Sequence, residues 1–207
     1  TQIELQPFRY DFIITSFLKE IPEDLLLNMS GSIRAYGDKN HINAVATINR
    51  IYLYLYGIGF TNSSDIIARL KDRRLSISAL SMKGDATEFR LSGNMTIGKN
   101  YDLTLEGSSS LAPLKAISKT IDVIKGNASF VFSISGDWDK PKINGGMDVN
   151  NGTLGFKDIN YRLTSISAYL YIDEDRITVQ RAAGKLSGGD VIISGTAYLQ
   201  RFSIKRF

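Results

Sequence analysis

The chain has 207 residues, of which 43% are hydrophobic, 10% aromatic and 22% charged. This composition excludes wholesale disorder and collagen-like structure, and the length suffices for one large all-β domain or two small ones. The 25 Lys and Arg residues exceed the 21 Asp and Glu residues by a net charge of +4 that is thinly spread along the chain. Because a nucleic-acid binder concentrates its basic residues on one face, we expect no nucleic-acid partner.

The residues that most enzymes and metal sites need are scarce. There is no cysteine, which excludes disulfides, thiolate nucleophiles and zinc–sulfur sites, and His41 is the only histidine. Neither a phosphate-cradling glycine loop nor a serine elbow is present. The densest acidic cluster, Asp173–Asp175, favours a solvated turn over a weak calcium site. We therefore predict no catalytic residue, no metal, no cofactor and no enzymatic activity.

No segment carries a membrane or export signal. No stretch approaches the roughly 20 apolar residues that a membrane-spanning helix needs, and no basic-then-apolar leader opens the chain. The sequence starts at Thr1 without a methionine, so we expect a fragment of a longer protein.

The first half of the chain is dominated by strand patterns. Phe8, Phe12, Ile13 and Phe17 predict a short helix that ends before Pro22. Beyond it, strict alternation of apolar and polar residues is typical of half-buried strands. It predicts strands over 42–48, 66–70, 75–79, 89–97 and 101–105.

The second half starts with a different period. Apolar residues recur at helical spacing from Leu111 to Ile124 and predict a helix over 111–125, after a serine run and before Gly126. Alternation then predicts strands over 166–172 and 177–179, around a charged turn, and a further strand over 191–199.

The two halves resemble each other. Four segments of the first half, 25–31, 38–43, 59–62 and 89–93, match 130–136, 139–144, 155–158 and 191–195 in the same order. Collinear matches of this kind indicate an internal duplication with a period of about 100 residues. We predict repeat 1 over 1–107, with a short N-terminal helix before its strands, and repeat 2 over 108–207, with helix 111–125 before its strands.

Every predicted strand has one apolar face. These faces can meet in a dry sandwich or closed barrel, which is the usual outcome. Alternatively, they line a bent sheet that stays open to hydrocarbon chains. Alternation alone does not separate the two arrangements.

The stretch from Gly126 to Leu199 resembles the C-terminal region of the TamB (translocation and assembly module) and AsmA-like families. The similar features are Ser135–Pro141, then Asn151–Leu154 with Gly155 and Phe156, and then Gly188-Gly189 leading into Val191–Gly195. Repeat 1 fits more loosely, since Asn40 stands where repeat 2 has Pro141.

The resemblance implies a mainly β fold, an elongated antiparallel sheet curved into a U-shaped, taco-like groove with a hydrophobic interior. It implies a periplasmic protein held in the inner membrane by an N-terminal anchor absent here. It also implies phospholipid as the cargo and a TamA-like outer-membrane barrel of the Omp85 type as a partner.

From these arguments we predict a non-enzymatic groove that conducts phospholipid acyl chains between the inner and outer membranes. The predicted lining residues are Ile66, Leu70, Ile77, Leu91, Met95, Leu103, Leu105, Met147, Val149, Ile166, Leu170, Val179 and Ile193. The alternative is a protein-interaction module that assists outer-membrane β-barrel assembly by β-augmentation at an exposed strand edge.

Overall fold

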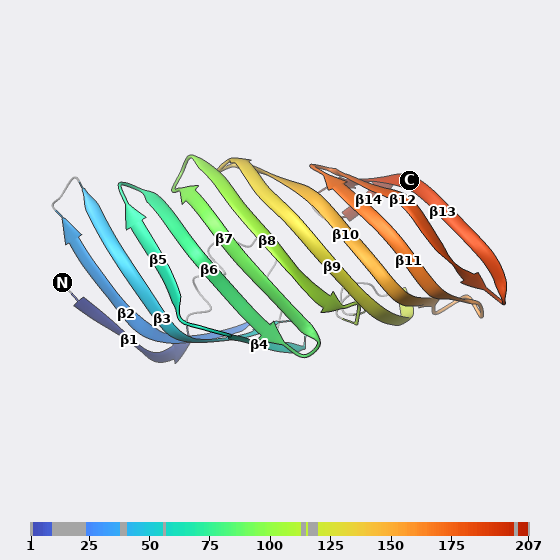
Figure 1. The fold of residues 1–207 in the computed structure, drawn as a ribbon, viewed down its shortest axis with the longest axis horizontal. Helices are drawn as coiled ribbons and strands as arrows, with labels where there is room; N and C mark the ends of the chain where they lie inside the picture. Colours follow the sequence, from blue (N-terminus) through green and yellow to red (C-terminus); the bar gives the residue numbers. More distant parts are fainter. Residues whose placement is uncertain are drawn as a thin grey trace. The chain divides into compact units, whose positions relative to one another are not determined.

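The structure, a computed structural model, describes residues 2–9, 24–37, 41–55, 57–112, 115, 120–200 and 203–206. As predicted, these residues form an almost entirely antiparallel β-sheet (Figure 1). The strands are β1 (Gln2–Arg9), β2 (Leu26–Gly37), β3 (Ile42–Leu55), β4 (Ile58–Asn62), β5 (Ile66–Lys71), β6 (Arg74–Gly84), β7 (Thr87–Thr96), β8 (Asn100–Ser110), β9 (Ile121–Asp137), β10 (Lys140–Phe156), β11 (Arg162–Asp173), β12 (Arg176–Leu186), β13 (Gly189–Gln200) and β14 (Ser203–Arg206).

The order of strands in the sheet follows the chain, except that β5 pairs with β3 and β6. This meander is the simplest antiparallel topology, because each strand pairs with the one that its own turn brings beside it.

The chain divides into two compact units. Unit 1 comprises Thr1–Thr104 and Ser135–Pro141, and unit 2 comprises Leu105–Ile134 and Lys142–Phe207. The tip of the β9–β10 hairpin thus belongs to unit 1 and the rest of that hairpin to unit 2. The division into sequence repeats at residue 107 stays a prediction.

A break in unit 1 separates β4 from β5, both of which pair with β3. The side chain of Asn62 organises the break. Its Oδ1 accepts a hydrogen bond from the Ile51 amide at 2.7 Å, and its Nδ2 donates to the carbonyl oxygens of Asn49 at 3.0 Å and Ser64 at 2.9 Å. One polar side chain therefore replaces ladder bonds that the interruption removes.

Tight hairpin turns join many of the strands. Asp72 and Arg73 both have positive φ, at 47° and 68°, as do Ser187 and Gly188, at 51° and 87°. Positive φ at both central residues is the geometry of the type I′ turn, whose twist matches that of the flanking strands.

Part of each predicted helix is a β-strand in the structure. Phe8 lies in β1, so the N-terminal helix prediction is wrong there, and residues 10–23 lie outside the described residues. Residues 121–125 begin β9, so the prediction of a helix over 111–125 is wrong over that end, while 113–114 and 116–119 are not described. Ile121 and Ile124 fit a helical period by spacing alone, but pairing in the sheet determines their conformation.

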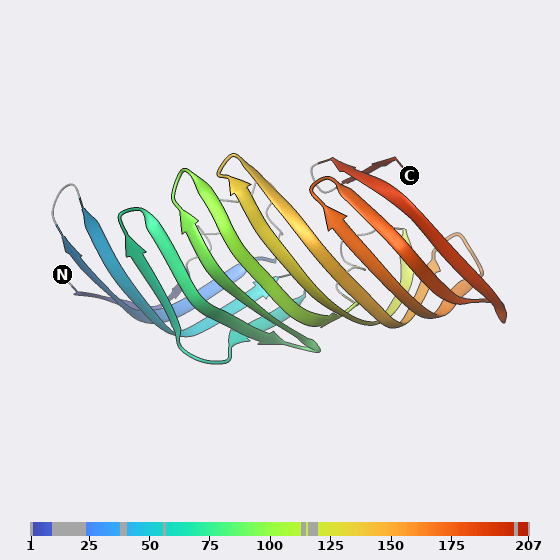
Figure 2. The same cartoon turned by 45° about the horizontal axis from the view of Figure 1, so that its top comes forward.

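The long strands bend along their length, as Figure 2 shows. Register shifts accompany the bends, for example between Ser30 and Gly31 in β2, and between Val149 and Gly152 in β10. Bulges of this kind increase local twist and curvature. The sheet of each unit is thus curved and not flat.

Candidate functional site: two apolar sheet faces

Unit 1 has one apolar face. Residues directly opposite each other on neighbouring antiparallel strands point to the same side of the sheet, so the register identifies that face. One cross-strand row runs through Ala35, Ala44, Leu70, Leu75 and Met95. The next row runs through Ile33, Ala46, Ala68, Ile77 and Gly93.

Further down the same face the side chains become larger. Ile66 lies opposite Ile48, and beyond a bulge Leu80 lies opposite Leu91. Phe60 and Phe89 meet edge to face with ring centroids 5.6 Å apart. A Cβ placed on Gly93 would lie 2.9 Å from the Cα of Leu103, so β8 adds Leu103 beside this row. The structure therefore brings Ile66, Leu70, Ile77, Leu91, Met95 and Leu103 together on one face.

Unit 2 repeats the arrangement. One row runs through Met147, Leu170, Val179 and Gly195, and the next through Val149, Ala168, Ala182 and Ile193. Ile166 follows opposite Gly152. Leu111, Ala128 and Val149 form a small buried cluster that Ile124, Met147, Ala168 and Leu170 contact. The predicted residues of β10 to β13 thus share one face, while Leu105 lies on β8, two residues after Leu103.

The apolar faces are only partly shielded from solvent. Of the thirteen predicted lining residues, Ile66, Leu103 and Val149 are buried, and Ile193 is 47% exposed. The remaining nine are partly exposed. All strands of the described residues belong to one sheet. These residues therefore do not form the two-sheet sandwich in which such faces would be sealed.

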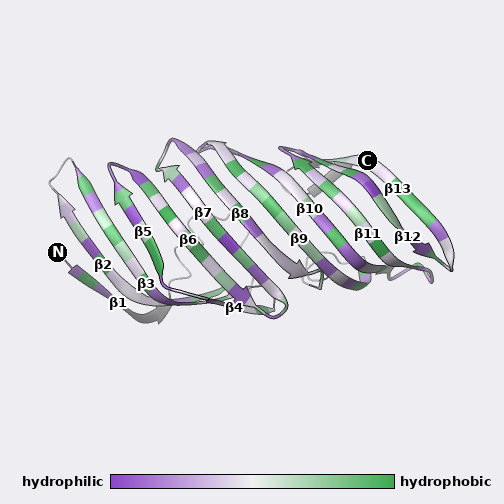
Figure 3. Ribbon diagram, viewed as in Figure 1, coloured by the Kyte–Doolittle hydropathy of each residue, from purple (hydrophilic) through white to green (hydrophobic). Residues whose placement is uncertain are grey.

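The opposite faces are more polar, although Ile192 is an exposed apolar residue on that of unit 2. In unit 1, one cross-strand row runs through Arg34, Val45, Arg69, Ser76 and Asn94, and the Ser76 hydroxyl donates to Asn94 Oδ1 at 2.7 Å. Figure 3 shows the alternation as hydrophobic and hydrophilic bands along individual strands. The sheet of unit 1 is thus amphipathic across its thickness.

A shallow hollow of about 470 Å³ lies in unit 2, lined in part by Ser129, Gly146, Asp148 and Tyr169. Tyr169 lies over Gly146, since a Cβ on that glycine would be 2.6 Å from the tyrosine hydroxyl. Asp148 is paired with Tyr169, whereas the neighbouring Met147 and Leu170 belong to the apolar row. Asp148 and Tyr169 therefore point away from the apolar face, and Phe130 and Val131 also line the hollow.

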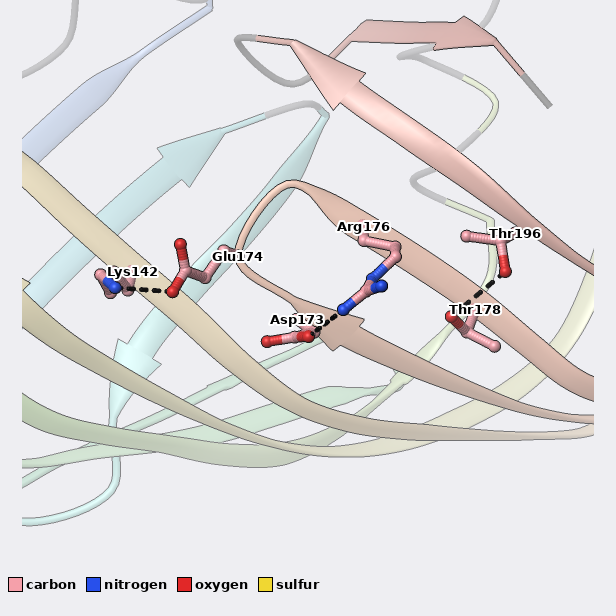
Figure 4. Close-up of polar contacts among 6 residues, drawn as sticks. All are labelled: Lys142, Asp173, Glu174, Arg176, Thr178 and Thr196. Atoms are coloured by element: carbon pink, nitrogen blue, oxygen red, sulfur yellow. Dashed lines mark hydrogen bonds and ion pairs between the residues drawn. The ribbon is translucent and has the colours of Figure 1, made fainter.

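The acidic hairpin tip of unit 2 is a network of ion pairs (Figure 4). Lys142 Nζ lies 2.6 Å from Glu174 Oε1, and Arg176 Nη2 donates to Asp173 Oδ2 at 2.6 Å. The hydrogen bond from Arg176 to Asp173 raises the pKa of the guanidinium. These contacts identify residues 173–176 as a charge-paired turn.

Aromatic side chains mark a hairpin end in unit 1. Trp138 stacks on Tyr101 with ring centroids 5.0 Å apart and an interplanar angle of 9°. The Trp138 amide donates to the Lys99 carbonyl at 2.8 Å. The sequence pattern did not identify Tyr101 as the stacking partner of Trp138.

His41 is exposed at the start of β3. Among the described residues no group of three or more His, Cys, Asp or Glu side chains is arranged to hold a metal ion. Over the same residues no helix has the length and apolar character required to cross a membrane.

Sequence reasoning missed other members of the two faces. In unit 1, Leu80 lies opposite Leu91 and Met82 lies opposite Phe89. In unit 2, Ile172 lies opposite Ile177. The bulge between Ile77 and Leu80 shifts the alternation by one residue, which hid Leu80 and Met82 from a strict period of two.

Comparisons of the chain with protein-family models, with curated proteins and with solved structures find no match.

Proposed function

We propose that this chain is a non-enzymatic segment that binds phospholipid acyl chains on its apolar sheet faces and conducts them along the sheet. The observation that carries the proposal is a face of large aliphatic side chains in each unit that is neither polar nor fully buried. A large contiguous apolar patch that stays exposed on a folded protein typically marks a binding site for a protein, a membrane or a ligand.

The energetics favour a hydrocarbon ligand. Burial of each methylene contributes about 0.8 kcal/mol, so an acyl chain gains affinity from contact area without specific polar partners. Rows such as Leu70, Leu75 and Met95 provide this contact on several adjacent strands. A surface of repeated rows lets a chain shift from one row to the next with similar affinity, which conduction requires.

The resemblance to TamB and AsmA-like proteins supports the same reading and extends it. It suggests a periplasmic location, an inner-membrane anchor elsewhere in the parent protein, movement of phospholipid between the inner and outer membranes, and a TamA-like outer-membrane barrel as partner. These extensions rest on the glycine and strand pattern of Gly126–Leu199.

Site-specific photo-crosslinking in cells tests the proposal. A photoreactive residue at Leu91 or Leu170 should crosslink to phospholipid. The same residue at the sequence neighbours Ser92 or Tyr169, on the polar faces, should not. Equal crosslinking at all four positions, or none at Leu91 and Leu170, would contradict lipid binding by the apolar faces.

One observation favours a second function, strand capture by β-augmentation. Among the described residues β14 pairs with Tyr198, Leu199 and Gln200, and no strand pairs with that edge of β13 over 189–197. Ile192 on this segment is 66% exposed. An unpaired edge rich in β-branched residues can template an incoming strand through main-chain hydrogen bonds.

The two functions respond differently to one substitution. Leu170→Arg places a charge on the apolar face and should abolish lipid crosslinking, but it leaves the β13 edge unchanged. An extended peptide with alternating apolar and polar residues should then still slow amide hydrogen exchange over 189–197. Unchanged exchange in the wild type at saturating peptide would exclude strand capture.

A further inference from the structure

Three hairpin turns of unit 1 are tied into one continuous edge, here called the unit 1 rim: Lys71–Arg74, Ile97–Lys99 with Tyr101, and Asp137–Lys140. The Ile97 amide donates to the Arg73 carbonyl at 2.9 Å, and Arg73 Nη2 donates to the Ile97 carbonyl at 2.9 Å. The Trp138 amide then donates to the Lys99 carbonyl at 2.8 Å. Adjacent turns are therefore held in fixed positions.

The rim carries five cations and three carboxylates, an excess of two positive charges. Its five basic residues, Lys71, Arg73, Arg74, Lys99 and Lys140, are all exposed, and its carboxylates are those of Asp72, Asp137 and Asp139. Within the described part of the chain none of the five forms an ion pair. Positive charge that the protein leaves uncompensated at one edge attracts anions.

Other turns of the chain differ in this respect. At the opposite end of β6 and β7, Lys83 lies 3.7 Å from Glu88. At the β11–β12 turn, Lys142 and Arg176 are paired with Glu174 and Asp173. The rim thus gathers five unpaired cations on adjacent turns, whereas these two turns pair theirs.

Arg73 is also positioned by the backbone. Gly98 has a φ of +73°, and a Cβ on it would lie 2.9 Å from Arg73 Nη2. A larger residue would displace the guanidinium from its bond to the Ile97 carbonyl. Since that bond uses one nitrogen, further N–H groups of the planar fork stay available to a phosphate.

The rim lies directly beside the apolar face of unit 1. Leu70, Leu75 and Met95 form the last apolar row, and each is within a few residues of a rim turn. With a rise of about 3.3 Å per residue, an anion at the turns lies roughly 10 Å from that row. In a phospholipid only the glycerol backbone separates the phosphate from the acyl chains, so a headgroup at the turns would place its acyl chains against this row.

The stacked pair of Tyr101 and Trp138 stands at the same boundary. Both rings combine an apolar body with one polar atom, which suits the region where hydrocarbon meets headgroup.

We propose that the unit 1 rim binds the phosphate of an anionic phospholipid headgroup while the acyl chains lie on the apolar face of unit 1. The inference rests on the proposed function, because it assigns the headgroup of the same lipid.

Lipid extraction from vesicles tests the assignment. The chain is incubated at low ionic strength with dioleoyl-phosphatidylglycerol or dioleoyl-phosphatidylcholine vesicles, and protein-bound lipid is quantified by mass spectrometry. We expect the wild type to take up the anionic lipid about tenfold more than the zwitterionic one, on the scale of a few basic residues beside an anionic headgroup. The variant Arg73→Gln, Arg74→Gln, Lys99→Gln should lose this preference and keep its uptake of phosphatidylcholine.

A charge-matched control separates the rim from net charge. The variant Lys83→Gln, Lys157→Gln, Lys185→Gln removes three exposed cations that do not belong to the rim and should keep the preference. Circular dichroism and urea midpoints of all three proteins establish that each is folded.

The outcomes are distinct. If the wild type extracts both lipids equally, or the rim variant keeps the preference, the headgroup assignment is overturned and acyl-chain binding stands. If the wild type extracts neither lipid, both proposals are overturned. If inorganic phosphate binds the wild type but not the rim variant, while both proteins extract the two lipids alike, the rim is a free-phosphate site and the lipid assignment is overturned.

Discussion

At the residue scale, glycines within strands allow close approach where the strands bend. Gly93 and Gly145 have φ values of +122° and +154°, conformations that residues with a side chain rarely adopt. A Cβ on Gly145 would lie 2.1 Å from the Val131 carbonyl oxygen, and one on Gly93 would lie 2.3 Å from that of Asp102. Both contacts are with backbone atoms, so a side-chain rotation would not relieve them.

We therefore expect Gly145→Ala to lower the free energy of unfolding by about 2 kcal/mol or more, the scale of backbone strain combined with a steric clash. Gly195→Ala is the matched control, because a Cβ there meets no atom within 4 Å. That variant should stay within about 0.5 kcal/mol of the wild type. Urea unfolding of both variants measures the difference, and equal midpoints would show that Gly145 is not constrained.

Tyr101 gives the chain a specific pH dependence. Partial burial, and to a smaller extent the nearby Asp139 carboxylate, raise the pKa of Tyr101. A raised folded-state pKa means that the folded chain holds this proton more tightly than the unfolded chain. The associated stability is complete below about pH 10 and is lost as the pH rises through the folded-state value.

Tyr101→Phe removes this titration but keeps most of the stack on Trp138. Between pH 8 and pH 10.5 the wild type should lose more free energy of unfolding than the variant does. Parallel pH curves for the two proteins in urea titrations would contradict a raised Tyr101 pKa.

At the scale of elements, the β11–β12 hairpin shows what surface ion pairs contribute. The Lys142 and Glu174 side chains are about half exposed, at 52% and 51%. Water and salt therefore screen their attraction.

A double-mutant cycle of Lys142→Ala and Glu174→Ala should give a coupling energy below about 1 kcal/mol, as exposed pairs do. The coupling should fall further in 1 M salt. A coupling that exceeds this value and persists in salt would show that the turn is more shielded than its exposure indicates.

The elements were predictable to different degrees. Alternation identified the strands around Leu70 and Leu170 and the charged turns between them, because a half-buried strand imposes a period of two. The helical spacing of Ile121 and Ile124 gave a wrong prediction, because these residues lie in β9, a strand that pairs with β10. Alternation also could not show that Asn62 interrupts the sheet, since its three hydrogen bonds depend on residues from 49 to 64 coming together.

At the scale of the whole molecule, each unit has one apolar and one polar face. Most residues of the apolar faces could be predicted, because residues such as Met147, Leu170 and Val179 follow the alternation of their own strands. These residues then align across neighbouring strands. The unit 1 rim could not be predicted. Arg73, Lys99 and Trp138 are far apart in sequence, and only the meander places their turns side by side.

If the apolar faces hold phospholipid, the lipid should survive gentle purification and be detected by native mass spectrometry. The wild type should carry adducts of phospholipid mass that Leu91→Arg and Leu170→Arg each reduce severalfold, while Ser92→Arg and Tyr169→Arg retain them. A wild-type spectrum without lipid adducts, or adducts that survive both apolar-face substitutions, would show that the apolar faces do not hold phospholipid.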